Sequence, residues 1–225
     1  RFRSYRMLAI QNTCGAGCCR EGDASERAFA TVRHNLARLG EVADLSPRAG
    51  EAIADLEARL ANLRTRRDHR AGEADVFYLS SSGGSAGAGT YVDAAIVAAG
   101  GVNLMAARGG QSWTRSDPEL VLDLSADLVV TSFFADGYHG RLNRARYHAA
   151  YDDLRNAEAR IEIPSGDWPC AGPRLIDAAE AIADALDAPG SRADDSVAAW
   201  RAWAHFVARR HLAERRQRQS RRRRH

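Results

Sequence analysis

A segment rich in glycine and serine, residues 80–90, has the residue types closest to a catalytic motif. Within it, Gly83-Gly84-Ser85-Ala86-Gly87 satisfies the G-x-S-x-G pattern, which places a nucleophilic serine on a sharp turn between a strand and a helix. No H-G-G-G segment for an oxyanion hole is present. The acid and base of a triad would have to come from later residues without a distinctive spacing: Asp127, Asp136, His139 and His148. A serine hydrolase built on Ser85 is therefore kept as the alternative function.

This segment has two other interpretations, and one of them is excluded. A dinucleotide-binding fingerprint is excluded because glycines spaced G-x-G-x-x-G are absent. The remaining interpretation is a loop whose bare backbone closely approaches a ligand or another segment of the chain. The sequence leaves open which of the two the loop approaches.

The basic residues and the cysteines exclude several other chemistries. All 32 basic residues are arginines, so a phosphate-loop lysine, a Schiff-base lysine and a Ser-Lys pair are impossible. The four cysteines, Cys14, Cys18, Cys19 and Cys170, lack the paired C-x-x-C spacing of a zinc site. We expect neither a metal site nor a cofactor.

The overall composition, 45% apolar and 27% charged in 225 residues, is typical of a globular protein. The net charge of +3 hides an uneven distribution. Residues 209–225 contain nine arginines and one glutamate, a net +8, so the rest of the chain carries −5. A basic end of this kind gives only nonspecific, salt-dependent attraction to nucleic acid, so we expect no specific nucleic-acid partner.

Short apolar runs alternate with helical patterns along the chain, which predicts an α/β fold with a mainly parallel sheet flanked by helices. One long helix is expected over residues 46–66, with a single apolar stripe and an arginine- and glutamate-rich face in water. The preceding helix is expected to end at Gly40. The expected strands are residues 7–10, 76–79, 128–131 and 159–163; the other expected helices are 24–39, 91–99, a short one capped by Asp117-Pro118, 142–156, 174–186 and 196–216. Ligands bind at the carboxyl ends of such strands, which predicts binding loops at 80–90, 132–140 and 164–173.

The order of five motifs resembles the periplasmic substrate-binding proteins of ATP-driven importers for cobalamin, haem and iron-siderophores, whose two lobes are joined by one long helix. The resemblance covers roughly residues 24–187. Each motif alone is weak, but the order is fairly specific. The motifs are Gly87-Ala88-Gly89-Thr90, Ala98-Ala99-Gly100-Gly101-Val102-Asn103, Ser112-Trp113, Glu119 eight residues before Asp127, and Ile163-Pro164-Ser165-Gly166-Asp167-Trp168-Pro169-Cys170-Ala171-Gly172-Pro173 before a helix.

The resemblance implies a binding protein and not an enzyme, located in the periplasm, that captures a metal chelate, corrinoid or tetrapyrrole and delivers it to a membrane permease. It implies that Glu119 docks on the permease, whereas the residue itself could simply favour the start of a helix. Trp168 is as well suited to packing as to ligand contact, and both Tyr91 and Phe133 could belong to the core. The candidate ligand contacts are Ser82, Tyr91, Trp113, Phe133, Tyr138 and Trp168.

The same resemblance suggests how the chain is divided. We expect residues 1–22 to be a remnant of an N-terminal lobe, 23–70 to be connecting helices and 71–190 to be the C-terminal ligand-binding lobe. Residues 191–225 would be a last helix and an arginine-rich tail, partly disordered. The first residues of the given sequence show no apolar core of a signal peptide, so we expect none within it. With one lobe largely missing, weak ligand binding is expected.

Overall fold

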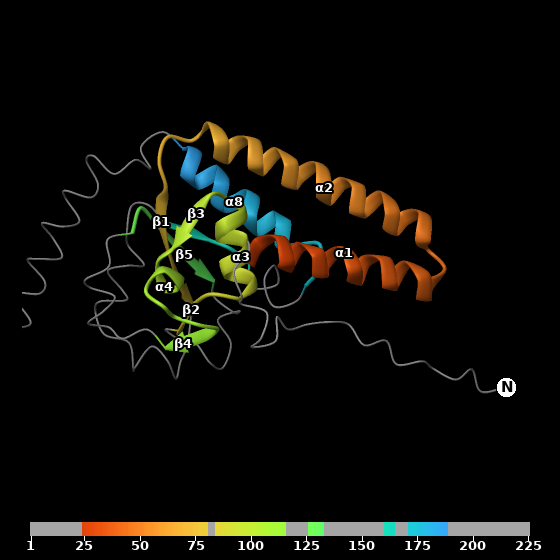
Figure 1. Cartoon of the computed structure of the whole chain (residues 1–225), viewed down its shortest axis with the longest axis horizontal. Coiled ribbons are helices and arrows are strands. Elements are labelled where there is room, and N and C mark those ends of the chain that lie inside the picture. Colours follow the sequence, from red (N-terminus) through yellow and green to blue (C-terminus); the bar gives the residue numbers. More distant parts are fainter. Residues whose placement is uncertain (1–23, 81–83, 116–125, 133–159, 165–170, 189–225) are drawn as a thin grey trace, which may run out of the picture.

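A computed structural model describes residues 24–80, 84–115, 126–132, 160–164 and 171–188. Within these ranges an α/β unit carries a long helical hairpin on one side (Figure 1). The elements are α1 (Ala24–Ala43), α2 (Ser46–His69), β1 (Ala74–Ser80), β2 (Gly84–Ala86), α3 (Tyr91–Ala98), β3 (Gly101–Asn103), α4 (Leu104–Ala107), β4 (Trp113–Arg115), β5 (Leu128–Ser132), β6 (Arg160–Glu162) and α8 (Leu175–Asp187). None of the helices in these ranges has the length and apolar character needed to cross a membrane.

The main sheet has four parallel strands in the order β3-β1-β5-β6. β1 and β5 are in register from Val76 opposite Leu128 to Ser80 opposite Ser132. The predicted α/β class and the three predicted strands that fall in the described ranges are therefore confirmed. β1, β5 and β6 are neighbours, so the segments that follow them leave from one edge of the sheet.

Side chains of β1 and β5 are buried on both faces of the sheet. Val76 and Tyr78 belong to one apolar cluster with side chains of α1, α2, α3 and α8. Phe77 and Leu79 alternate with them and are also buried, at 0% and 2% exposure. Burial on both faces explains why these strands are continuous apolar runs.

The hairpin of α1 and α2 corrects one prediction, because α1 does not end at Gly40. Gly40 is buried against the first turns of α2, and a Cβ there would lie 2.5 Å from Cβ of Ala49. The chain turns later, at Asp44, whose φ of 58° is in the left-handed region. The N–H of Leu45 then donates to the carbonyl of Gly40 at 2.8 Å and closes the end of the helix. Gly40 therefore serves close helix packing instead of helix termination.

The arginine- and glutamate-rich face of α2 is exposed to water over most of its residues, as expected, but not at every arginine. The predicted apolar stripe is confirmed by the buried Leu56, Leu60 and Leu63, but three arginines beside it are paired with acids of α8 (Figure 1 shows the two helices side by side). These ion pairs join Arg59 to Asp177 and Glu180, Arg66 to Asp184 and Asp187, and Arg70 to Asp187. They fix α2 on the α/β unit.

Three short strands were missed by the sequence analysis. Residues 80–90 were expected to be loop throughout, yet β2 lies within them and pairs with β4 as a separate antiparallel ribbon. β3 follows Gly100, whose φ of 82° provides the expected turn at the end of α3. The expected strand at 7–10 and the expected helices at 117, 142–156 and 196–216 lie outside the described residues.

Candidate functional site

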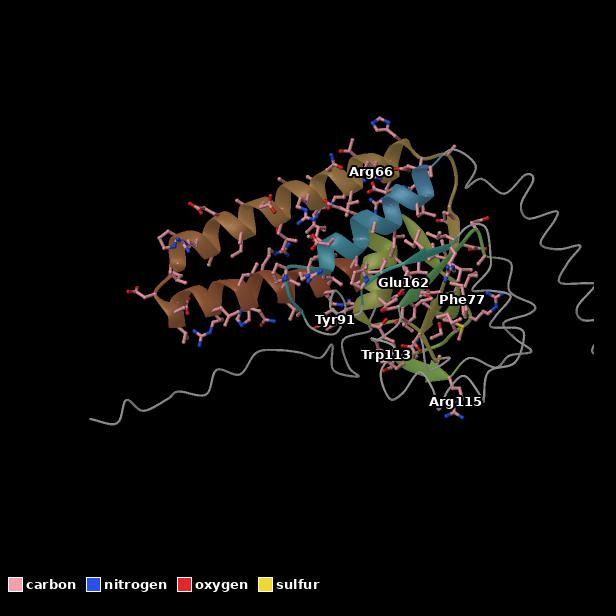
Figure 2. The ribbon with its side chains drawn as sticks, turned by 180° about the vertical axis from the view of Figure 1, so that it is seen from behind. Arg66, Phe77, Tyr91, Trp113, Arg115 and Glu162 are labelled. Carbon is pink, nitrogen blue, oxygen red and sulfur yellow. The ribbon has the colours of Figure 1, made fainter. Side chains whose placement is uncertain are left out.

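The candidate site lies at the carboxyl ends of β1 and β5, the edge where ligands bind in parallel α/β sheets. Ser80 and Ser132 end these strands opposite each other, and both are buried. The β2–β4 ribbon, residues 84–86 paired with 113–115, follows β1 at this edge. Figure 2 shows Trp113 and Arg115 on β4 at one end of the α/β unit, with Arg66 toward the other end.

Among the described residues of this edge, Trp113 is an exposed aromatic residue. Its side chain is 54% exposed, although a residue of this type is usually well buried. The indole meets the ring of Tyr78 edge to face, with centroids 5.9 Å apart and planes at 71°. Tyr78 is fully buried, and this burial raises the pKa of its hydroxyl to about 12, against a smaller lowering by a hydrogen bond with Ser132. The buried Tyr78 ring thus supports the Trp113 ring, and the exposed part of the indole is available for contact with an apolar or conjugated ligand.

The position of Ser85 is not that of a catalytic nucleophile. It is 0% exposed on β2, and its Oγ donates a hydrogen bond of 2.6 Å to the carbonyl of Tyr78. Asp127 lies at the opposite, amino end of β5, where Oδ2 accepts the N–H of Asp75 at 2.7 Å. The other triad candidates, Asp136, His139 and His148, lie outside the described residues. The structure therefore gives no support to a hydrolytic role for Ser85, which links β2 to β1.

The backbone of the glycine-rich segment approaches the residues just before β4. The N–H of Gly87 donates to the carbonyl of Ser112 and that of Ala88 to the carbonyl of Gly110, both at 2.8 Å. A Cβ on Gly87 would overlap the carbonyl group of Gly110. Glycine is required here because another part of the chain packs against the backbone.

The structure describes two of the six predicted ligand contacts. Trp113 is at the site edge as described above. Tyr91 begins α3 and is 8% exposed within the core cluster, so any ligand contact would involve little of its surface. Its alternative role in the core agrees with this burial. The remaining candidates lie outside the described residues: Ser82, Phe133, Tyr138 and Trp168, together with the docking candidate Glu119.

Sequence reasoning gave no role to Tyr78 or Asp93, and it named Asn103 only as the last residue of a motif. Tyr78 falls in an apolar strand, where nothing distinguishes a supporting ring from ordinary core. Asp93 carried a usable signal, since a carboxylate in the apolar helix α3 needs a buried partner, and Asn103 is that partner at 2.9 Å.

In the part of the chain that the structure describes, no group of three or more His, Cys, Asp or Glu side chains could hold a metal ion.

A four-stranded parallel sheet flanked by helices, with a long helix packed on it, defines an α/β fold. Comparison with solved structures narrows this class to the periplasmic binding protein fold. A haem-binding protein from Pseudomonas aeruginosa matches with a TM-score of 0.58 and 21% identity, over 70% of this chain and 59% of that one. The Fe3+-hydroxamate transport protein of Saccharomonospora viridis matches at 0.57 and 20%, over 71% and 56%. The vitamin B12-binding protein of Vibrio cholerae matches at 0.53 and 22%, over 70% and 61%.

These comparisons establish the fold, as the resemblance in the sequence implied. The chain spans 56 to 61% of the length of these three structures. Neither a protein-family model nor a curated protein matches the sequence.

Proposed function

We propose that the chain is the ligand-binding component of an ATP-driven importer, which captures an iron-siderophore, haem or cobalamin-type ligand in the periplasm and delivers it to a membrane permease. The observation that carries this proposal is the exposed indole of Trp113, supported by Tyr78 at the carboxyl edge of the sheet. The three structures named above share the fold; two are described as haem-binding and vitamin B12-binding proteins, and the third as an Fe3+-hydroxamate transport system.

The strand order supports a shared role for the other candidate contacts. Ser82 follows β1, Phe133 and Tyr138 follow β5, and Trp168 follows β6. These three strands are neighbours and parallel, so the segments after them start from the same edge as Trp113. Large ring-containing ligands suit such aromatic surroundings, because conjugated rings and chelates have broad apolar faces to bury.

Delivery to a permease requires a contact outside the ligand site. Glu119 lies between β4 and β5 in the sequence, and we propose that it forms an ion pair with an arginine of the permease. The ordinary role of such an acid is to favour a helix N-terminus. The docking role predicts that loss of the Glu119 charge lowers transport through the permease, whereas the helix-terminus role does not.

Titration of the chain with three coloured probes, haemin, a ferric trihydroxamate and cyanocobalamin, tests the proposal. At least one probe should bind saturably, change its absorbance spectrum and quench tryptophan emission. Trp113→Ala should weaken binding, and Leu39→Ala, at an exposed apolar residue of the hairpin end, is the matched control. Absence of saturable binding by all three probes would refute the proposed ligand class.

A further inference from the structure

A buried polar network lies behind the turn that leads from β2 to α3. Asp93 and Asn103 are each 3% exposed. Nδ2 of Asn103 donates to Oδ1 of Asp93 at 2.9 Å and to the carbonyl of Ala86 at 3.0 Å. Oδ1 of Asn103 accepts the N–H of Met105 at 3.1 Å. Both hydrogens and the oxygen of this side-chain amide are therefore used.

Asp93 and Thr90 hold the other side of the turn. Oδ2 of Asp93 accepts the N–H of Gly89 at 3.1 Å. Oγ1 of Thr90 donates to the carbonyl of Gly87 at 2.9 Å and accepts the N–H of Asp93 at 3.0 Å. Gly89 has a φ of 79°, a conformation that glycine tolerates and that the hydrogen bond from its own N–H stabilises. The network thus fixes the backbone of the turn from residue 86 to residue 89.

This turn is paired with the segment that carries Trp113. Ala86 lies opposite Trp113 in the β2–β4 register. One step along, Gly87 and Ala88 bond to Ser112 and Gly110 as described above, and the N–H of Ser112 donates to the carbonyl of Ala88 at 3.0 Å. Close packing of Gly87 on Gly110 leaves no space for the two segments to shift toward each other. A displacement of the turn would therefore displace the backbone of Trp113.

We propose that Asp93 and Asn103 are positioning residues. They hold the backbone of residues 86–89, and through this backbone they keep the Trp113 indole in contact with Tyr78 and available to a ligand. Neither side chain touches the ligand surface, since both are buried beneath the turn. The effect on ligand affinity rests on the proposed function. The effect on the indole requires no ligand, so the two can be tested separately.

Asp93→Asn is the most direct variant, because it keeps the shape and replaces one acceptor by an NH2 group. That group must face the N–H of Gly89 or the amide of Asn103, so one hydrogen bond becomes a contact between two donors. The double variant Asp93→Asn with Asn103→Asp restores a donor and acceptor pair between the two positions. Thr90→Val, which removes the bond to Gly87, serves if Asp93→Asn does not fold.

Fluorine NMR of the full chain containing 5-fluorotryptophan gives the ligand-free test. The sequence has four tryptophans, and Trp113→Phe assigns the resonance of Trp113. We expect Asp93→Asn, and Thr90→Val in its place, to shift or broaden that resonance while the other three stay unchanged, and the double variant to restore it in part. Asp187→Asn, which breaks the ion pairs of Asp187 with Arg66 and Arg70, should leave it unchanged. An unchanged Trp113 resonance, or an equal change in Asp187→Asn, would overturn the proposal.

The ligand test is a double-mutant cycle with whichever of haemin, ferric trihydroxamate or cyanocobalamin binds the wild-type chain. Asp93→Asn should lower affinity in the wild-type background and have little effect when Trp113 is already alanine, because the two changes act through one group. An equal loss in both backgrounds would contradict the positioning role. If no probe binds the wild-type chain, the proposed ligand class fails, and the fluorine spectra still decide whether the network positions Trp113.

Discussion

The buried ring of Tyr78 and the half-exposed indole of Trp113 meet edge to face with centroids 5.9 Å apart, although they are 35 positions apart in the sequence. Tyr78 lies in the central strand β1 and Trp113 on the short strand β4. The contact therefore connects the core of the α/β unit to the surface where a ligand would bind. Edge-to-face pairs of this kind contribute about 0.5 to 1.5 kcal/mol beyond the area they bury.

Tyr78 should make the fold sensitive to alkali. Burial raises the pKa of its hydroxyl to about 12, whereas a tyrosine in an unfolded chain ionises at about 10. Between these values the unfolded state has lost the proton and the folded state retains it, so stability falls as pH rises. We expect Tyr78→Phe to lose less stability than wild type between about pH 9 and pH 11, measured by urea unfolding. Equal losses in the two proteins would show that Tyr78 does not have the raised pKa.

Ser85→Ala should affect stability and not hydrolysis. The Oγ of Ser85 donates to the Tyr78 carbonyl at 2.6 Å, and loss of a buried hydrogen bond of this type lowers the free energy of unfolding by about 1 kcal/mol. Activity on simple esters should stay at background in wild type and variant alike. A drop in ester turnover of about 100-fold, the scale expected for removing a catalytic group, would reinstate the hydrolase.

The ion pairs between α2 and α8 should fail in acid. Burial alone would raise the pKa of Asp187, but the hydrogen bonds from Arg70 and Arg66 and the positive charges of these arginines together outweigh it and lower that pKa below the usual value. A lowered pKa stabilises the fold above the unfolded value of about 3.9, and this contribution is lost as pH falls through the folded value. Asp187→Asn should therefore destabilise the chain near neutral pH and flatten its stability profile below about pH 5.

The control for Asp187 is Asp68→Asn. Asp68 is exposed on α2 and pairs with its neighbour Arg67, so its replacement should change thermal stability little at either pH. A stability profile for Asp187→Asn that is parallel to wild type throughout the acid range would refute the assigned role of these ion pairs.

The helices of eight or more residues and the strands β1, β5 and β6 could be predicted from the sequence, because each has a readable apolar pattern. β2, β3 and β4 could not, since they are short and lack such a pattern, and β2 and β3 contain glycine, which is depleted in strands. The predicted end of the first helix at Gly40 was wrong for a related reason. A glycine near a helix end fits both a terminator and a close helix contact, and only the position of Ala49 in space distinguishes them.

The site was predictable in part for similar reasons. Trp113 was identified from the resemblance, and its position at the carboxyl edge agrees with a ligand contact, which remains a prediction. The pairing of Asp93 with Asn103 depends on how α3 and β3 pack, so no local pattern reveals it.

Glu119→Gln should reduce transport without changing ligand affinity, because the proposed permease contact is separate from the ligand site. Uptake of a labelled ligand by cells that contain the permease is the measurement, with affinity of the purified variant determined in parallel. A charge reversal of the paired permease arginine, combined with Glu119→Arg, should recover part of the uptake. A fall in affinity that accounts for the fall in uptake would instead assign Glu119 to the ligand site.

Calorimetric titration of the monomeric chain with haemin, a ferric trihydroxamate and cyanocobalamin tests the central claim most directly. We expect one of them to bind with a dissociation constant near micromolar, about −8 kcal/mol, because the described edge provides contacts from one α/β unit alone. Trp113→Ala should weaken this binding and Trp168→Ala should abolish it, while Leu39→Ala leaves it intact. Binding that is unaffected by both tryptophan changes would contradict the assigned site, and heats no greater than dilution for all three ligands would contradict the function.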